Sequence, residues 1–300
     1  MLTLSPAFKD RITAIHGLKG QKWLASLPEL QTELVERLSL SNLQPIENLS
    51  YNYLVFASAP ENKSVVLKLG VPNRELDTEI LALKAYDGKG TVRLLEANPF
   101  QGVLLLERIL PGESLLSIED DRESTRIAAR LMKRIWIPAP HDVEFPSAED
   151  WCLGFQRYLD HYANRGPLPT DLVHRANELS NELLSRPQEL LLHGDLHHMN
   201  ILLGENNTWV AVDPKGVIGE DAFEVGSLIL NPVPDLVRWP DLKAIQKQRL
   251  AILSEELNID QGRLTAWSFV RAVLSSIWSL EDGEDWKYGV SIAEILRELI

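Results

Sequence analysis

The sequence predicts an α+β fold of two lobes, a small N-terminal lobe with helices and an antiparallel sheet and a larger, mainly helical C-terminal lobe. Three observations support this fold class. The chain has 300 residues, which is longer than one typical domain. Of these residues 45% are hydrophobic, enough for a substantial core. Its apolar residues change from a helical to a strand-like period and back before about residue 110. Beyond that point the period is almost entirely helical.

The N-terminal lobe begins with a helical region at residues 5–40. Its apolar side chains recur at steps of mostly three or four residues, at Trp23, Leu24, Leu27, Leu30, Leu34 and Leu38. YLVFASAPENKSVVLKLGVP then holds two β-rich runs around a polar turn, which predicts a hairpin. NRELDTEILALKAYDG is helical up to Gly88, and TVRLLEANPFQGVLLLERILPGESL predicts two more strands.

The C-terminal lobe is predicted to be helical at six places: residues 119–136, 147–164, 170–186, 241–256, 260–281 and 285–299. Residues 190–213 are the exception, because LLLHG, NILLG and TWVAVD are short apolar runs that end in turn residues. A hinge at residues 107–112 divides the chain into residues 1–108 and 109–300.

Charge and composition restrict the classes of ligand and metal site that we expect for this chain. The formal net charge is −13 and the sequence pI is about 5.1, which argues against binding of nucleic acid or an anionic membrane and is compatible with a cationic small molecule. The one cysteine excludes an internal disulfide and a cysteine-based zinc site. No signal sequence and no apolar run of membrane-spanning length is apparent, so we expect a cytoplasmic protein.

The polar stretch LLLHGDLHHMNILLGENNTWVAVDPKG lies between apolar runs and has three interpretations: a metal site, a phosphoryl-transfer site, or a turn that satisfies its own backbone. His193, Asp195, His197 and His198 would be the ligands of a metallohydrolase. The histidines follow a turn rather than a helical H-x-x-x-H pair, and adjacent side chains tend to diverge, so this interpretation is the weaker one.

The phosphoryl-transfer interpretation assigns a role to more residues of this stretch than the metal-site interpretation does. Asp195 would accept the proton of the substrate hydroxyl, while Asn200 and Asp213 would hold Mg²⁺ against the nucleotide phosphates. A polar loop followed by a short hairpin brings groups at this spacing to one place.

The same residues resemble a known family. HGDLHHMN followed by VDPKG resembles the catalytic loop of aminoglycoside phosphotransferases, which are relatives of protein kinases. LLHGDLHHMNIL, DPKGVIGEDAFEVGSLILNP and VVLKLGVP are similar to the aminoglycoside/hydroxyurea antibiotic resistance kinase family, which includes streptomycin 6-kinases. The resemblance covers about residues 50–235. It implies a bilobal protein kinase-like fold, a nucleotide-binding N-terminal lobe, and ATP- and Mg²⁺-dependent phosphorylation of a small-molecule hydroxyl, with an aminoglycoside as the expected acceptor.

The kinase interpretation assigns nucleotide-binding residues to the N-terminal lobe. Lys68 in the apolar run SVVLKLG would bind phosphates, and Glu79 would hold Lys68, with Glu75 as the runner-up. The alternative for Lys68 is an edge-strand lysine that reaches solvent. The Glu107 carbonyl and the Ile109 amide at the hinge would contact adenine.

One departure from protein kinases concerns the phosphate-covering loop. The corresponding segment ENLSYNYLVF contains no glycine, so Ser50 and Asn52, together with Tyr51, are the candidates for this contact.

Near the catalytic aspartate, His193 and His198 are predicted to support the loop, and Gly194 to allow its tight turn. For His198, contact with substrate or phosphate is the alternative. Lys215 would add positive charge near the transferred phosphoryl group, or else pair with Asp213 or Glu224.

A cationic acceptor requires carboxylates and aromatic faces. GEDAFEVGS and SIWSLEDGEDW supply the candidates Glu220, Asp221, Glu224, Trp278, Glu281 and Asp282, with Glu284, Asp285 and Trp286 beside them. For the second segment the alternative is a solvated charged face, and for Glu224 it is a helix cap or a loop anchor. Two other functions remain open: a metabolic kinase with a non-antibiotic acceptor, and a kinase-like nucleotide-binding module without catalysis.

Overall fold

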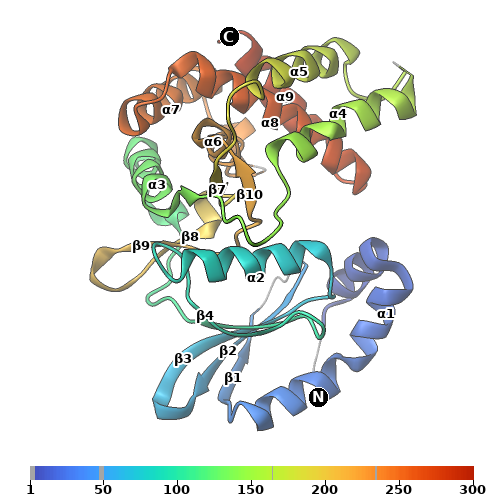
Figure 1. Cartoon of the computed structure of the whole chain (residues 1–300), viewed down its shortest axis with the longest axis vertical. Coiled ribbons are helices and arrows are strands. Elements are labelled where there is room, and N and C mark those ends of the chain that lie inside the picture. The colour runs from blue at the N-terminus through green and yellow to red at the C-terminus, as the bar shows by residue number, and fades with distance from the viewer. Residues whose placement is uncertain (1–3, 47–50, 164, 234) are drawn as a thin grey trace. The chain divides into compact units, whose positions relative to one another are not determined.

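A computed structural model describes residues 4–46, 51–163, 165–233 and 235–300 (Figure 1). The chain divides into two compact units. The first unit consists of Met1–Gly88 and Val92–Ile109, and the second unit of Lys89–Thr91 and Leu110–Ile300.

The first unit is built on a five-stranded antiparallel sheet with the order β1-β2-β3-β5-β4. The strands are β1 (Ser41–Pro45), β2 (Tyr53–Ala59), β3 (Lys63–Leu69), β4 (Leu94–Asn98) and β5 (Val103–Glu107). The β2–β3 hairpin and the β4–β5 pair are confirmed, whereas β1 was not predicted because SNLQP has no apolar alternation.

One helix lies on each face of this sheet (Figure 1). Successive side chains of a strand point to opposite faces, so Val65, Leu67 and Leu69 of β3 join the core under α1 (Pro6–Arg37). The predicted apolar stripe of α1 packs there, and a break at Gly17 divides this helix. The intervening Lys68 points to the other face, toward α2 (Arg74–Tyr86).

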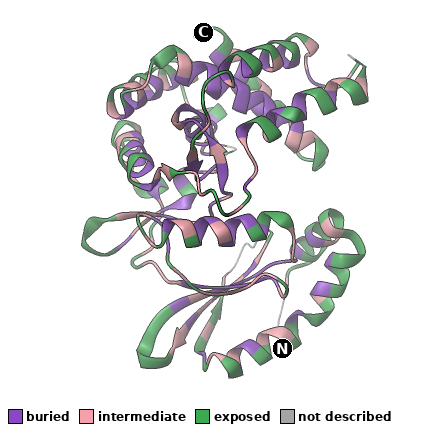
Figure 2. Cartoon of the chain, in the orientation of Figure 1, coloured by how far each residue is buried: buried purple, intermediate pink, exposed green. Residues whose placement is uncertain are grey.

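The second unit contains the six predicted helices: α3 (Asp121–Ile135), α4 (Ala148–Tyr162), α5 (Thr170–Leu183), α7 (Leu242–Leu257), α8 (Gln261–Glu281) and α9 (Lys287–Arg297). A further helix, α6 (Asp221–Ile229), was not predicted. Helix α8 is buried along most of its length and packs against α4, α5, α6, α7 and α9 (Figure 2).

Short strands and turns carry the polar stretch of the second unit. Strands β6 (Ile137–Pro138), β7 (Leu190–Leu192) and β10 (Val217–Gly219) form one small sheet, and β8 (Ile201–Leu203) and β9 (Trp209–Ala211) form a hairpin. The 3₁₀ turns of the chain are η1 (Pro60–Asn62), η2 (Leu115–Ser117), η3 (His198–Asn200), η4 (Glu205–Asn207) and η5 (Asp235–Arg238). The predicted catalytic loop therefore runs from the end of β7 through η3 into β8.

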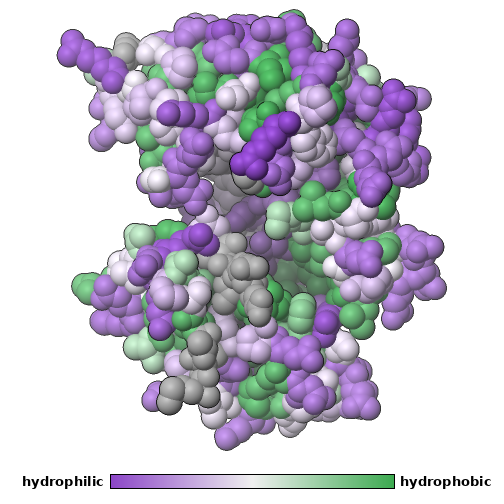
Figure 3. Space-filling model, turned by 180° about the vertical axis from the view of Figure 1, so that it is seen from behind, coloured by the Kyte–Doolittle hydropathy of each residue, from purple (hydrophilic) through white to green (hydrophobic). Residues whose placement is uncertain are grey.

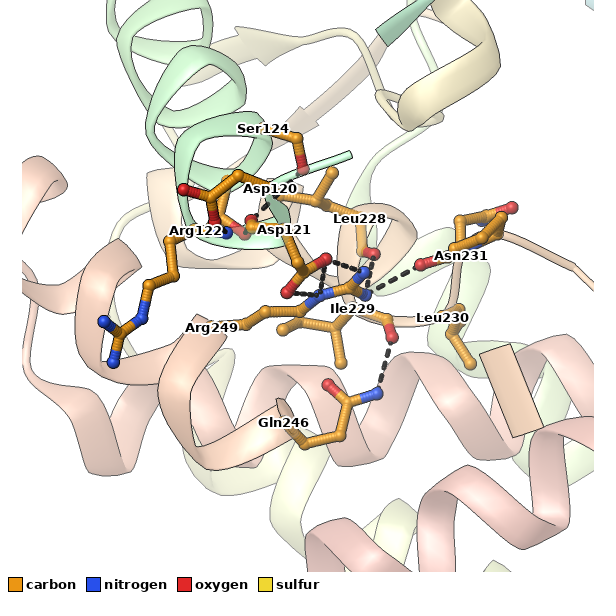
Figure 4. A network of polar contacts seen from close by, with 12 residues as sticks. Asp120, Asp121, Arg122, Ser124, Leu228, Ile229, Leu230, Asn231, Gln246 and Arg249 are labelled. Carbon is orange, nitrogen blue, oxygen red and sulfur yellow. Dashed lines mark hydrogen bonds and ion pairs between the residues drawn. The ribbon is translucent and has the colours of Figure 1, made fainter. Parts of the chain in front are cut away.

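A buried polar network holds the end of α6 (Figure 4). The Arg249 guanidinium of α7 donates to Asp121 of α3 at 3.0 Å and to the Asn231 carbonyl at 2.7 Å. Gln246 donates to the Ile229 carbonyl at 2.9 Å. Because a buried charge is costly unless it is paired and hydrogen-bonded, these contacts hold α3, α6 and α7 together.

Hydrophilic residues cover much of the visible surface of the second unit in the space-filling view, with apolar areas between them (Figure 3). None of the described helices combines the length and the apolar character that crossing a membrane requires.

Candidate active site

The site residue of the first unit is a buried lysine paired with a buried glutamate. Lys68 Nζ lies 2.7 Å from Glu79 Oε1 and 2.8 Å from Oε2. The two residues are 4% and 5% exposed. Removing two charges from water is costly, and contact this close offsets part of that cost. Glu79, rather than the exposed Glu75, is therefore the partner of Lys68, and Lys68 is not an edge-strand lysine in solvent.

The other nucleotide-binding candidates lie at the ends of strands. Glu107 ends β5, where its Oε1 accepts from the Arg93 amide at 2.8 Å, and Ile109 is the last residue of the first unit. Asn52 is half-buried just before β2, with its side-chain oxygen against Gly70. Ser50 lies outside the described residues.

In the second unit, Glu224 anchors the backbone of the predicted catalytic loop. Its two carboxylate oxygens accept from the backbone amides of His193 at 2.7 Å and Gly194 at 2.9 Å. The side chain belongs to α6 and is 1% exposed. Burial raises the pKa of Glu224 to about 7, and the two amide donors oppose this shift.

His193 holds the two sides of the loop together. Its Nε2 lies 2.9 Å from the Val212 carbonyl, and its Nδ1 accepts from the Asp195 amide at 3.2 Å. These contacts suit a neutral ring that carries its proton on Nε2. Burial lowers the pKa of His193 to about 4, which keeps the ring neutral. His193 thus contacts the backbone on both sides of the loop, which is consistent with its predicted support role.

Backbone contacts bring the remaining loop candidates together. The side-chain amide of Asn200 donates to the Asp195 carbonyl at 2.9 Å, and the Asn200 carbonyl accepts from the Val212 amide at 2.9 Å, next to Asp213. The Lys215 amide donates to the His193 carbonyl at 2.8 Å. Asp195, Asn200, Asp213 and Lys215 therefore belong to one connected loop system, in which the Asp195 side chain is 33% exposed.

The second support candidate, His198, is buried. His198 is 3% exposed, and neither of its ring nitrogens has a hydrogen-bond partner within the described part of the chain. Burial lowers the pKa of His198 to about 3. Over the residues placed by the structure, no three His, Cys, Asp or Glu side chains form a group that could hold a metal ion. The geometry thus gives no support to a histidine-based metal site.

Two of the predicted acceptor carboxylates are structural. Glu224 is the loop anchor described above. Glu220, at 9% exposure, accepts from Arg263 at 2.6 and 2.7 Å and from the Trp267 indole nitrogen. Both carboxylates are buried and engaged by the protein, which favours the loop-anchor alternative for Glu224 and an ion-pair role for Glu220.

The other acceptor candidates differ in exposure. Asp221 is half-buried, and its carboxylate accepts from the Ala222 amide at 2.8 Å; burial raises its pKa. Trp278 is half-buried and packs edge-on against Trp151, with 5.3 Å between ring centroids. Glu281 and Asp282 are exposed at the end of α8.

Sequence reasoning missed Arg271 of α8. Its Nη2 donates to the Gly194 carbonyl at 3.1 Å and to Ser227 Oγ at 2.8 Å. The signal was present, because Arg271 is the single charge within the run AWSFVRAVLSSIW. A lone charge in an apolar run also identified Lys68.

Comparisons with known proteins identify the family of the chain. The family model described as aminoglycoside/hydroxyurea antibiotic resistance kinase matches residues 41–283. Streptomycin 6-kinase of Streptomyces glaucescens is 29% identical over 290 residues, which cover 94% of this chain and 92% of that protein. Hydroxyurea phosphotransferase of Kitasatospora aureofaciens is 30% identical over 288 residues, 93% of this chain and 82% of that protein.

Solved structures confirm the predicted protein kinase-like fold. A choline/ethanolamine kinase family protein from Mesorhizobium loti has a TM-score of 0.66 at 15% identity, covering 90% of this chain and 94% of that one. A macrolide 2'-phosphotransferase from Brachybacterium faecium has a TM-score of 0.55 at 15% identity, covering 89% and 97%. With the family model matching most of the sequence, the chain belongs to the aminoglycoside/hydroxyurea antibiotic resistance kinase family and is a phosphotransferase that acts on a hydroxyl group of a small molecule.

Proposed function

We propose that the protein transfers phosphate from ATP, with Mg²⁺, to a hydroxyl group of an aminoglycoside, as the streptomycin 6-kinases that it resembles are named for doing. The Lys68–Glu79 pair carries this proposal. A buried ion pair is often no more stabilising than apolar residues of the same volume, so its presence in an apolar sheet calls for a role beyond stability. Holding the charge of nucleotide phosphates is such a role.

The first unit would bind the nucleotide. Lys68 would contact the phosphates while Glu79 keeps its ammonium in one orientation. The Glu107 carbonyl and the Ile109 amide would contact the adenine, and Asn52 would approach the phosphates from the start of β2; Ser50 is proposed from the sequence alone.

The second unit would supply the acceptor chemistry. Asp195, whose side chain is partly exposed, would accept the proton of the attacking hydroxyl. Lys215 would face the charge that develops on the transferred group. His193 and Glu224 would keep the loop in place through the contacts at its backbone.

Asn200 and Asp213 suit Mg²⁺, which prefers carboxylate and amide oxygens. The Asn200 amide nitrogen is used by the Asp195 carbonyl, and this leaves its oxygen as the atom for ligation. Bound Mg²⁺ would neutralise phosphate charge during transfer.

A cationic acceptor suits the net charge of −13 and the exposed Glu281 and Asp282. Hydroxyurea is the alternative acceptor, because a hydroxyurea phosphotransferase is among the relatives. A metabolic hydroxylated amine is a third acceptor class for the same chemistry.

The test is transfer of labelled phosphate from ATP to streptomycin, hydroxyurea and choline, each with Mg²⁺ and with EDTA. We expect Mg²⁺-dependent labelling of streptomycin, and none with Asp195→Ala. Labelling of another acceptor alone would replace the aminoglycoside proposal, and absence of transfer to all three would contradict the proposed acceptor classes.

A further inference from the structure

Arg271 is a buried cation whose guanidinium contacts the backbone of the predicted catalytic loop. It is 5% exposed and belongs to α8, a helix that is buried along most of its length. Nη2 donates to the Gly194 carbonyl at 3.1 Å and to Ser227 Oγ at 2.8 Å, and Ser227 Oγ donates to the same carbonyl at 3.3 Å. Nη1 is buried without a hydrogen-bond partner among the residues that the structure describes.

Aromatic rings enclose the Arg271 guanidinium. Its central carbon lies 4.9 Å from the ring centroid of Trp151 and 5.2 Å from those of Phe223 and Trp278. These rings come from α4, α6 and α8, so their faces replace water around the charge. Gly226 makes room for the arginine, since a Cβ there would lie 2.4 Å from Arg271 Cγ.

The peptide group that joins Gly194 to Asp195 is consequently held at both of its polar ends. Its carbonyl accepts from Arg271 and Ser227, and its amide donates to His193 Nδ1. A peptide group is planar, so fixing both ends fixes the orientation of its plane and the direction of the Asp195 N–Cα bond, which limits where the Asp195 side chain can point. Gly194 meets this geometry with φ of +81°, a conformation that favours glycine.

Arg271 also lies within electrostatic reach of two carboxylates. Burial lowers the pKa of Arg271, and Asp195 and Glu224 oppose that shift. The loop thus has a carboxyl anchor, Glu224, on its amides and a cationic one, Arg271, on a carbonyl.

We propose that Arg271 is a positioning residue for phosphoryl transfer, which sets the orientation of Asp195 through the Gly194 carbonyl. This proposal rests on the role proposed above for Asp195. Trp151, Phe223 and Trp278 then serve to keep the guanidinium in place, and Trp278 acts on catalysis from behind the loop rather than as an acceptor-binding face.

The experiment compares Arg271→Met and Arg271→Lys with Arg263→Met in the full chain. Arg263 is the matched control, because it is a largely buried α8 arginine in an ion pair with Glu220 at 2.6 Å, and its hydrogen bonds within the described part of the chain go to Glu220 and the Leu183 carbonyl rather than to the loop. Kinetics use Mg-ATP and streptomycin, and amide hydrogen exchange is followed at residues 193–195 without substrate.

For Arg271→Met we expect kcat to fall at least about tenfold, with KM for both substrates within about threefold, because misplacement of a catalytic group slows chemistry more than binding. Amide exchange at 193–195 should accelerate. Arg271→Lys keeps the charge and should recover part of both effects. Arg263→Met should be less stable to heat, yet keep the kcat and the loop protection of the unaltered protein.

Unchanged kcat and unchanged exchange in Arg271→Met would overturn the proposal, as would equal effects from Arg263→Met. If Arg271→Met does not fold, Arg271→Lys and Ser227→Ala provide the test, since each weakens the hold on the Gly194 carbonyl; unaltered loop exchange in both overturns it. Lack of turnover by the unaltered protein counts against the proposed function only, because the exchange comparison still decides whether Arg271 holds the loop.

Discussion

The two units hold their proposed catalytic groups in different ways. In the first unit, Lys68 lies on a regular strand and pairs with Glu79, eleven residues along the chain. In the second unit, Asp195 lies on a loop whose backbone is held by Glu224 of α6, Arg271 of α8 and the ring of His193. A strand orients its side chains by its own pleat, whereas a loop needs anchors from elsewhere.

This difference predicts which substitutions affect both stability and activity and which affect mainly activity. Removing the partner of Lys68 mainly exposes an uncompensated charge, so it acts on stability as well as on function. Removing an anchor of the loop leaves the side chain of Asp195 in the protein but frees its direction.

The largest expected effect comes from Asp195 itself. Asp195→Ala should lower kcat by about 10²- to 10⁴-fold, the range that a general base contributes, while the Kd for ATP stays within about threefold. Steady-state kinetics and calorimetric titration with Mg-ATP measure the two quantities. Full activity in this variant would remove the proposed role.

The Lys68–Glu79 pair should show a loss of stability that can be reversed without restoring activity. Lys68→Met leaves a buried carboxylate without its cation and should lower the free energy of unfolding by about 3–5 kcal/mol. The double variant Lys68→Met/Glu79→Leu should recover most of that stability and remain inactive. Urea unfolding and phosphate transfer test this; recovery of activity in the double variant would show that the pair is only structural.

Glu224 should make stability depend on pH. Its pKa is about 7 in the folded chain and 4.5 as a model value, so the folded chain holds the extra proton between these pH values. Its contribution is fully present below pH 4.5 and is lost as the pH rises through 7, a change of about 3 kcal/mol.

The measurement is urea unfolding of the unaltered protein and Glu224→Gln from pH 4.5 to 7.5. The unaltered protein should lose stability relative to Glu224→Gln as the pH rises. Parallel curves for the two proteins would show that the anchor keeps one charge state throughout.

The smallest effect is expected at the exposed end of α8. Glu281→Gln with Asp282→Asn should change the free energy of unfolding by less than about 0.5 kcal/mol, because both side chains are solvated. If they bind a cationic acceptor, KM for streptomycin rises about two- to fivefold at constant kcat. The exposed pair Glu29→Gln with Glu33→Gln on α1 makes the same charge change and serves as control. Equal KM values in both would assign Glu281 and Asp282 to a solvated face.

The elements of the first unit were largely predictable, because α2 and the β2–β3 hairpin have clear periods in the sequence. Helix α6 escaped prediction because DAFEVGSLI is short and includes two acidic residues, and β10 because three residues carry no period. The burial of Glu220 and Glu224 was not predictable, since an acidic cluster suggests a charged surface and their burial depends on Arg263 and on the loop amides.

The sequence by itself determined the secondary structure of most of the chain and the set of groups proposed for phosphoryl transfer, because periodicity and the spacing of Asp195, Asn200 and Asp213 are local properties. Only the tertiary structure decided which carboxylates are anchors and which cation contacts the backbone of the loop. Those contacts join residues 31 and 77 positions apart, and a group's burial and partners are set by such distant contacts rather than by its neighbours in sequence.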